Sequence, residues 1–186
     1  LLLPLGIGDS RLDPLGVLWA LAAAVLWGLP ALRPDYSRVH TTIDDRHKGG
    51  LVSGKRHVHP RPLPPEDVVL LDGIRVTSLA RTAIDCAMAG DYEQALVLID
   101  GARQVPRFPR PTDRPTVPFA ELVRVVKTLG RRTGSDMVIR ALADSVECSE
   151  SAGESWSRAR MLQWKLPPPE LQRTFRIRGR TYYVDF

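Results

Sequence analysis

The first half of the chain combines one long apolar run with several short stretches in which apolar and polar residues alternate. Residues 14–32 carry no charged side chain, and a run of this length can span a bilayer. The segment before the run has no net positive charge, unlike a signal peptide, and Gly28 and Pro30 interrupt the run. The pattern therefore predicts a buried core helix over residues 15–27 rather than a membrane-spanning helix.

Four short stretches after this run show the alternation that is typical of half-buried strands. The sequence Asp72-Gly73 between the last two stretches is the strongest short signal for a hairpin turn. A polar loop is expected at residues 44–54. The predicted strands cover residues 36–43, 55–61, 68–71 and 74–77.

Capping residues mark the starts of the helices that follow. Thr77 or Ser78 can cap a helix over residues 77–87, and Asp91 with Gln94 three residues later forms a capping box. Helical periodicity continues in the second half of the chain until three prolines stop it. The remaining predictions are helices at residues 119–129, 135–147 and 151–165 and strands at 171–177 and 181–186.

A proline-rich segment divides these elements into two groups. Five prolines fall within residues 105–118, where they exclude a helix or an inner strand. We therefore predict an α+β fold with a mixed helix and strand module at residues 1–104. A linker follows at residues 105–118, and helices leading into a further α/β unit occupy residues 119–186.

Basic residues are concentrated around this linker. The chain holds 26 Lys and Arg residues against 21 Asp and Glu residues, and most of the cations are arginines, which suit phosphate partners. Such a segment attracts DNA or RNA by releasing counterions from the phosphates, although a solvated linker and helix face would have the same composition. The predicted nucleic-acid contacts are Arg103, Arg107, Arg110, Arg114, Arg124, Lys127, Arg131 and Arg132.

Cysteine and histidine give a limited signal. Cys86 and Cys148 lack the spacing of a metal site or of a disulfide framework, which predicts free thiols in a reducing, cytoplasmic environment. His57 and His59 stand two apart in a predicted strand and share a face, so they can bind one metal ion with His47 or Asp45 as a third ligand. Against a metal site, a His-x-His pair in a strand is common without metal, and no Cys or Glu joins the set.

Two acids near the end of the chain can also carry chemistry. Glu154 lies in the first turn of a predicted helix, and Asp185 lies late in the second strand of the hairpin that follows. A helix acid and a strand acid brought together can hold a divalent metal for phosphodiester hydrolysis. The structural alternative is that Glu154 completes a capping box with Ser151 and that Asp185 ends a strand.

Four segments of the first half of the chain are distinctive: "VLWGLPAL" (25–32), "RVHTT" (38–42), "HVHPRPL" (57–63) and, most specifically, "DGIRVTSLARTAIDCA" (72–87). With these segments, residues 15–104 resemble the AbiEi-type antitoxin family of bacterial type IV toxin–antitoxin systems. The resemblance implies a regulatory protein that acts through DNA and a cognate toxin of the nucleotidyltransferase type. Family members usually begin with a winged helix-turn-helix, and the residues ahead of Leu15 are too few to form one.

The C-terminal segment contains "SESAGESWSRARMLQWKLPPPELQ" (149–172) and "YYVDF" (182–186). These residues are similar to very-short-patch-repair endonucleases, a branch of the PD-(D/E)XK nuclease fold. The similarity implies a partial restriction-endonuclease-like α/β unit in which Glu154 is the helix acid and Asp185 the strand acid. The family usually continues into a strand with a further acid and a basic residue, so we expect this chain to be truncated at both ends.

Together these observations predict an antitoxin-like regulatory protein that is cytoplasmic, associated with DNA and non-catalytic as given, with no membrane partner. The alternative is a metal-dependent DNA endonuclease in which Glu154 and Asp185 bind Mg²⁺ and the rest of the active site lies beyond Phe186. The sequence leaves open whether the chain is an enzyme.

Overall fold

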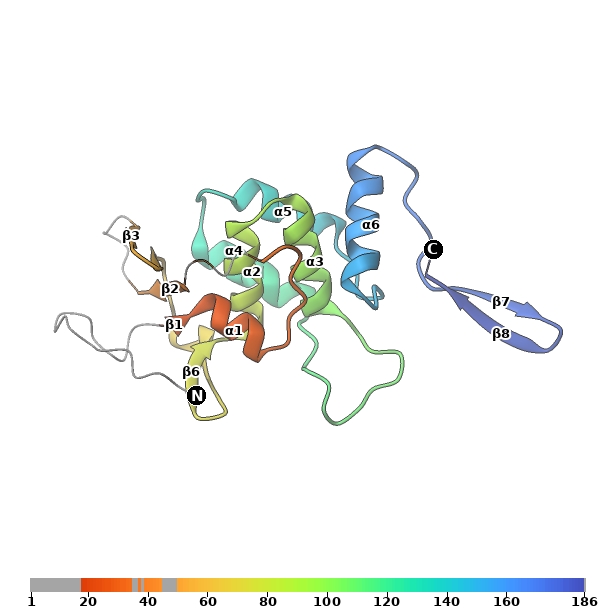
Figure 1. The fold of residues 1–186 in the computed structure, drawn as a ribbon, viewed down its shortest axis with the longest axis horizontal. Helices are drawn as coiled ribbons and strands as arrows, with labels where there is room; N and C mark the ends of the chain where they lie inside the picture. The colour runs from red at the N-terminus through yellow and green to blue at the C-terminus, as the bar shows by residue number, and fades with distance from the viewer. Residues whose placement is uncertain (1–17, 35–36, 38, 45–49, 186) are drawn as a thin grey trace.

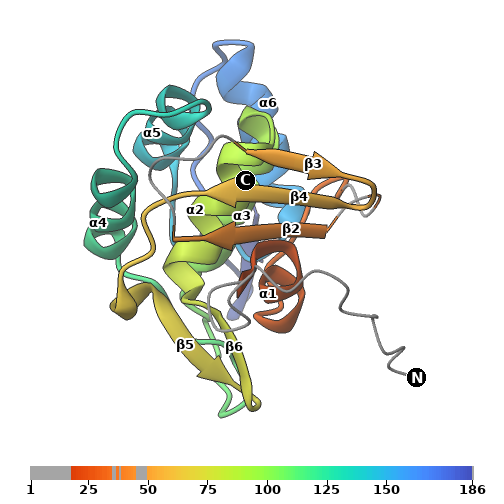
Figure 2. The ribbon, with the colours of Figure 1, turned by 90° about the vertical axis from the view of Figure 1, so that its left-hand side faces the viewer.

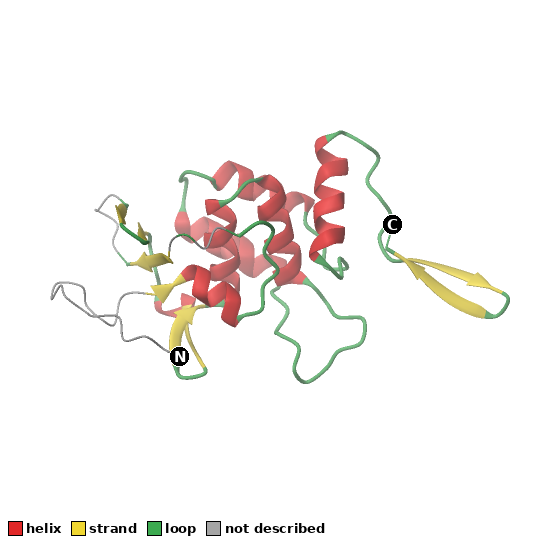
Figure 3. Cartoon of the chain, in the orientation of Figure 1, coloured by secondary structure: helices red, strands yellow, loops and turns green. Residues whose placement is uncertain are grey.

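The computed structural model describes residues 18–34, 37, 39–44 and 50–185, and within them the chain has the mixed α+β architecture expected from the sequence. Helices form the body, a small sheet lies at one end of it, and a hairpin projects from the other end (Figure 1). Figure 3 shows the same division, with the strands at the periphery of the helical body. The helices are α1 (Ala20–Leu26), α2 (Leu79–Ala89), α3 (Tyr92–Arg103), α4 (Phe119–Leu129), α5 (Ser135–Asp144) and α6 (Ala152–Gln163).

The helices begin where the capping signals predicted. The side chain of Ser78 accepts a hydrogen bond from the backbone of the first turn of α2. Asp91 and Gln94 form a complete capping box at the start of α3, with both hydrogen bonds at 2.9 Å. At the start of α6 the hydroxyl of Ser151 accepts from the backbone N–H of Glu154, while the Glu154 side chain accepts from the backbone N–H of Glu150, one residue before the position expected for a capping box. Each cap satisfies backbone N–H groups that have no partner inside the helix.

The core of the helical body lies around α2 and α3. Apolar side chains from all six helices belong to one buried cluster, so the helices on both sides of the proline-rich segment share a single core. Residues 105–118 contain neither helix nor strand, as the prolines predicted. The proposed boundary at 105–118 thus divides the sequence but does not divide the core. Fully buried members of the core are Ile84, Leu96, Ile99, Leu122, Val125 and Val138.

A four-stranded sheet packs against this body in the order β1-β2-β4-β3. Figure 2 shows β2, β4 and β3 side by side across one side of α2. Strand β2 runs parallel to β4, in a register that pairs His40 with His57 and Thr42 with His59. The other two pairs of neighbouring strands, β1 with β2 and β3 with β4, are antiparallel. The strands are β1 (Leu18–Trp19), β2 (Val39–Ile43), β3 (Leu51–Ser53) and β4 (Arg56–Pro60).

Two elements of this region differ from the sequence prediction. Leu18–Trp19 form strand β1 rather than the start of a helix, because they pair with β2. Leu51–Ser53 form strand β3 within the segment predicted to be a polar loop, because they pair with β4. Helix α1 therefore has only seven residues, and in the described part of the chain no helix has the length and apolarity to cross a bilayer.

Two hairpins complete the fold, and both have the tight turn expected of two-residue hairpin loops. Asp72 and Gly73 have φ angles of 50° and 78°, which join β5 (Val68–Leu71) to β6 (Ile74–Thr77) as predicted. Arg178 and Gly179 have φ angles of 50° and 75° between β7 (Arg173–Ile177) and β8 (Arg180–Val184). Positive φ at both central positions matches the right-handed twist of the flanking strands.

Candidate functional site

The predicted basic segment is used largely for contacts inside the protein. Seven of its eight cations form hydrogen bonds or ion pairs within the chain, and Lys127 is exposed. Arg103 donates to the carbonyl of Ser145 at 2.6 Å, and Arg132 donates to the carbonyl of Leu129 at 2.8 Å. Arg124 pairs with the buried Asp67. These guanidinium groups hold segments of the fold together.

The proline-rich excursion is fastened by two further arginines of the predicted set. Arg114 donates to the carbonyl oxygens of Gly101 and Gly28, the latter at 3.0 Å, which joins the excursion to α3 and to the end of α1. Arg107 pairs with Glu150 at 3.0 Å and also donates to Gln172. Arg110 and Arg131, by contrast, are largely exposed and make only exposed ion pairs with nearby acids.

A second basic segment, the β7–β8 hairpin, was not singled out from the sequence. Residues 173–184 contain four arginines and no acid, and every residue of both strands is exposed. The projection of this hairpin away from the helices explains the exposure (Figure 1). The sequence signal was the two-residue turn Arg178-Gly179, with Arg180 directly after it and Arg176 two residues before it. The arginines are Arg173, Arg176, Arg178 and Arg180.

Aromatic residues interleave with these arginines. The register pairs Phe175 with Tyr182 and Thr174 with Tyr183, and paired residues share a face of the ribbon. Phe175 and Tyr182 are 42% and 48% exposed on one face. Tyr183 lies on the other face, where the guanidinium of Arg107 sits 4.1 Å from its ring centre and links the hairpin to the proline-rich excursion.

The helix acid of the predicted metal pair is buried and engaged in the cap of α6. Ser151 donates its hydroxyl to Glu154 Oε1 at 2.8 Å. Glu154 Oε2 accepts from the backbone N–H of Glu150 at 3.0 Å and from the side-chain amide of Gln172 at 3.1 Å. Both carboxylate oxygens therefore already have hydrogen-bond donors from the chain itself.

The strand acid lies just beyond β8. Asp185 is exposed, and its backbone carbonyl accepts a hydrogen bond from the backbone N–H of Gln172 at 3.2 Å. Gln172 thus contacts Glu154 through its side chain and Asp185 through its backbone. The two acids predicted as a metal pair therefore share Gln172 as a hydrogen-bond partner.

Three histidines gather on the sheet at the opposite end of the body. His57 and His59 come from β4, as the sequence predicted for a shared face, and His40 joins them from β2. The ring centres of His57 and His59 lie 4.0 Å apart, and His40 lies 5.2 Å from each. His40 Nδ1 is 3.0 Å from His59 Nε2. The earlier candidates for a third ligand, His47 and Asp45, lie outside the described residues.

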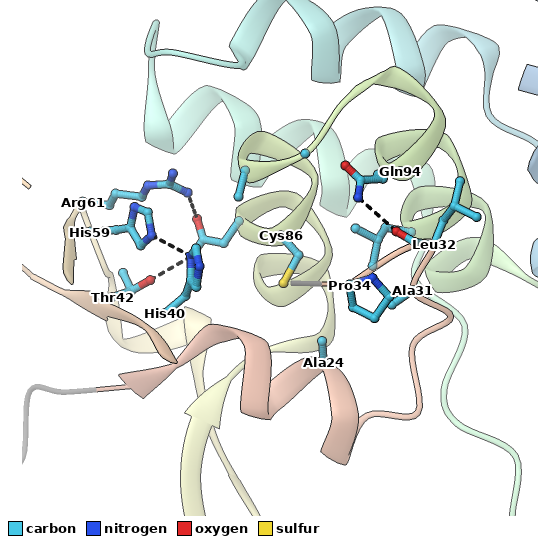
Figure 4. Close-up of a pocket in the computed structure, with 14 residues that line it drawn as sticks. Ala24, Ala31, Leu32, Pro34, His40, Thr42, His59, Arg61, Cys86 and Gln94 are labelled. Atoms are coloured by element: carbon cyan, nitrogen blue, oxygen red, sulfur yellow. Dashed lines mark hydrogen bonds and ion pairs between the residues drawn. The ribbon is translucent and has the colours of Figure 1, made fainter. Parts of the chain in front are cut away.

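The histidine cluster borders a cavity of about 170 Å³ between the sheet and α2, shown in Figure 4. His40, His59, Thr42 and Arg61 line it on the sheet side, and Cys86 lines it on the helix side. Burial, followed by the nearby guanidinium of Arg61, lowers the pKa of His59 from 6.5 to about 4, so its ring is neutral at neutral pH. Burial raises the pKa of the Cys86 thiol to about 12, which keeps the sulfur protonated.

A buried carboxylate, Asp85 of α2, fixes the strands that carry the histidines. Thr42 of β2 donates its hydroxyl to Asp85 at 3.2 Å, and Arg61, one residue beyond β4, pairs with Asp85 at 2.6 Å. Arg81 pairs with the same carboxylate at 2.9 Å and with Asp67 at 3.1 Å. Both histidine-bearing strands are therefore attached to one point on α2.

The predicted residues thus fall into separate regions. The cations of residues 103–132 are spread over the end of α3, the proline-rich excursion, α4 and the turn after it. The two acids lie on α6 and just after β8, and the three described histidines of the cluster lie on the sheet. Comparison with protein-family models, with curated proteins and with solved structures finds no match to this chain.

Proposed function

We propose that this chain is a DNA-associated regulatory protein that contacts DNA through its β7–β8 hairpin. The observation that carries the proposal is the exposed, acid-free run of four arginines in residues 173–184. Cations that make no strong ion pairs with the protein remain available for phosphates. Among the hairpin arginines, Arg173 has an ion pair with Glu170, and that pair is exposed.

The shape of the hairpin suits this role. A two-stranded ribbon fits into the major groove of B-form DNA, where arginine can bind phosphates or the edge of guanine. The exposed rings of Phe175 and Tyr182 add surfaces that contact thymine methyl groups or unpaired bases. Both kinds of contact come from side chains that support little else in the fold.

The regulatory role within a toxin–antitoxin pair is supported by the AbiEi-like motifs in residues 15–104. In this proposal the chain restrains a toxin of the nucleotidyltransferase type and binds DNA without needing catalysis. The DNA interface and the toxin interface would then lie in different parts of the chain.

Fluorescence anisotropy with a labelled DNA duplex tests the DNA interface. The triple variant Arg176→Ala, Arg178→Ala and Arg180→Ala should weaken binding roughly 100-fold at low salt, because it removes three phosphate contacts. It should also reduce the slope of log affinity against log salt by about 3, which is the expected loss of released counterions.

A charge-matched control separates the hairpin from the segment predicted first. The variant Arg110→Ala, Lys127→Ala and Arg131→Ala removes three exposed cations from residues 103–132 and should leave affinity nearly unchanged. Equal weakening by both variants would move the interface away from the hairpin. Failure of the unaltered chain to bind duplex DNA at low salt would refute the proposed function.

The second candidate is a Mg²⁺-dependent DNA endonuclease that uses Glu154 and Asp185. It is favoured by the position of Gln172, which contacts both residues. To bind a metal ion, the Glu154 carboxylate would have to give up hydrogen bonds that it accepts from the Glu150 backbone and the Ser151 hydroxyl. Mg²⁺-dependent cleavage of duplex DNA that Asp185→Ala abolishes, with DNA affinity retained, would establish this activity. Salt-sensitive binding without cleavage leaves the regulatory proposal in place.

A further inference from the structure

We propose that His40, His57 and His59 form a zinc site whose fourth coordination position opens toward the cavity beside α2. The proposal is independent of DNA binding, since the cluster lies on the sheet and the hairpin lies at the other end of the body (Figure 1). It rests on the positions of three imidazoles and on the chemistry of the groups around them.

The nitrogen atoms already lie close to the spacing that a metal ion requires. One ligand nitrogen from each histidine can be chosen so that all three lie within 4.8 Å of one another. Zinc–nitrogen bonds of about 2.0–2.1 Å in a tetrahedral arrangement place ligand nitrogens about 3.3 Å apart. The distance of 3.0 Å between His40 Nδ1 and His59 Nε2 is near this value. Small ring rotations would bring the three nitrogens around one ion.

The backbone explains why these rings converge. Parallel pairing of β2 and β4 sets His40 directly beside His57, and the two-residue repeat of a strand returns His59 to the same face. Asp85 fixes both strands, through Thr42 on β2 and through Arg61 after β4. Ligands on strands that are fixed in this way lose little conformational freedom when an ion binds.

The surrounding groups favour zinc over a cation that prefers oxygen ligands. Asp85, the carboxylate that lines the same cavity, is occupied by Thr42, Arg61 and Arg81. Cys86 lines the same cavity from α2, but the group of ligand atoms that lie within 4.8 Å of one another consists of His40, His57 and His59. Three imidazoles without a carboxylate suit zinc and related transition metals rather than Mg²⁺ or Ca²⁺.

The cavity determines what kind of zinc site this would be. Structural zinc sites are usually closed by four protein ligands, whereas sites with three protein ligands leave a position for water or another small molecule. His40 and His59 line a cavity of about 170 Å³, which has room for water at the ion. Arg61 also lines the cavity, so a small anion is the expected ligand to replace that water.

The test uses the full chain freed of metal with a chelator. Calorimetric titration with Zn²⁺ should give one site per chain, and Co²⁺ should give the intense visible absorption of a tetrahedral complex. Excess Mg²⁺ should not displace either ion. Azide added to the Co²⁺ form should shift the absorption, because an exogenous anion would enter the open position.

Single substitutions identify the ligands. His40→Gln, His57→Gln and His59→Gln should each lower zinc affinity about 100-fold or more, because each removes one of three ligands. Glu154→Gln on α6 is the control and should retain full affinity. His47→Gln tests the open fourth position, which predicts that this variant also keeps its affinity. Circular dichroism without metal establishes that each variant is folded. A variant that does not fold is replaced by the corresponding asparagine substitution.

Three results would overturn the proposal. They are absence of zinc binding by the folded chain, retention of full affinity in all three ligand variants, and loss of affinity in His47→Gln equal to that in His57→Gln. The last result would assign the ion to a different ligand set. DNA affinity measured in the same variants should not change, so failure of the zinc site and failure of the proposed function are distinguishable.

Discussion

The helical body and the β7–β8 hairpin use the same residue type in opposite ways. In the body, Arg81 is fully buried between Asp67 and Asp85, and Arg158 is buried against Asp100 at 2.6 Å. In the hairpin, the arginines are exposed, and the segment between them contains no acid. Burial of the guanidinium against acceptors of the chain, either carboxylates or backbone carbonyls, thus decides whether an arginine supports the fold or remains available to a partner.

The same comparison holds for stability. The body buries one continuous apolar cluster, and its charged groups are paired inside it. A two-stranded hairpin with all strand residues exposed adds little stability of its own in water. We therefore expect substitutions in the body to change the free energy of unfolding, and substitutions in the hairpin to change binding.

The largest effect is expected at the centre of the buried charge network. Arg81→Met leaves Asp67 and Asp85 each without one of their cationic partners in a site excluded from water. Breaking a buried pair by removing one partner costs about 3–5 kcal/mol of unfolding free energy. Urea denaturation followed by circular dichroism measures this loss. A loss below 1 kcal/mol would show that the network is not central to the stability of the body.

An intermediate effect is expected where α6 meets α3. Glu93 accepts hydrogen bonds from Trp156 at 2.7 Å and from Arg160 at 3.0 Å, and it pairs with Arg33 at 3.1 Å. Burial alone would raise the pKa of Glu93, but these donors outweigh it and lower the pKa below the ordinary value of 4.5. Stability from this carboxylate is therefore present above pH 4.5 and lost as the pH falls through the lowered pKa.

Glu93→Gln keeps the shape of the side chain and removes its charge. It should cost about 1 kcal/mol at neutral pH, because both of its cationic partners, Arg33 and Arg160, are partly exposed and screened by solvent. The difference in unfolding free energy between the variant and the unaltered chain should shrink as the pH falls below 4.5. Denaturation curves at several pH values measure it, and a constant difference would exclude Glu93 as the titrating group.

The smallest effect on stability is expected in the hairpin. The variant Arg176→Ala, Arg178→Ala and Arg180→Ala should change unfolding free energy by no more than about 0.5 kcal/mol, because these side chains are exposed. The same urea titration measures it beside Arg81→Met. A larger loss would mean that the hairpin is part of the cooperative unit, and the contrast between the two regions would be wrong.

Local features were predictable from the sequence because they depend on neighbouring residues. The turn at Asp72-Gly73, the cap at Ser78 and the capping box of Asp91 and Gln94 all involve residues within a few positions of one another. Strands β1 and β3 escaped prediction because segments of two and three residues have no measurable periodicity. Their conformation depends on pairing with β2 and β4.

In the candidate sites too, contacts between neighbouring residues were predictable and contacts between distant residues were not. His57 and His59 could be paired from their spacing, whereas the contribution of His40 depended on the parallel register of β2 and β4. The charge surplus of residues 103–132 was visible in the sequence, but the partners that occupy its arginines lie far along the chain. Composition locates cations and does not tell which of them the fold has already paired.

The shared core determines how the protein behaves when a protease cleaves it within the proline-rich excursion. Residues 108–112 form an exposed part of the proline-rich excursion, and the helices on either side of it bury their apolar faces together. Cleavage there would leave two fragments that hold each other through α2, α3 and the helices that pack on them. The protein would then behave as a complemented pair of fragments, which migrates as one particle until a denaturant separates it.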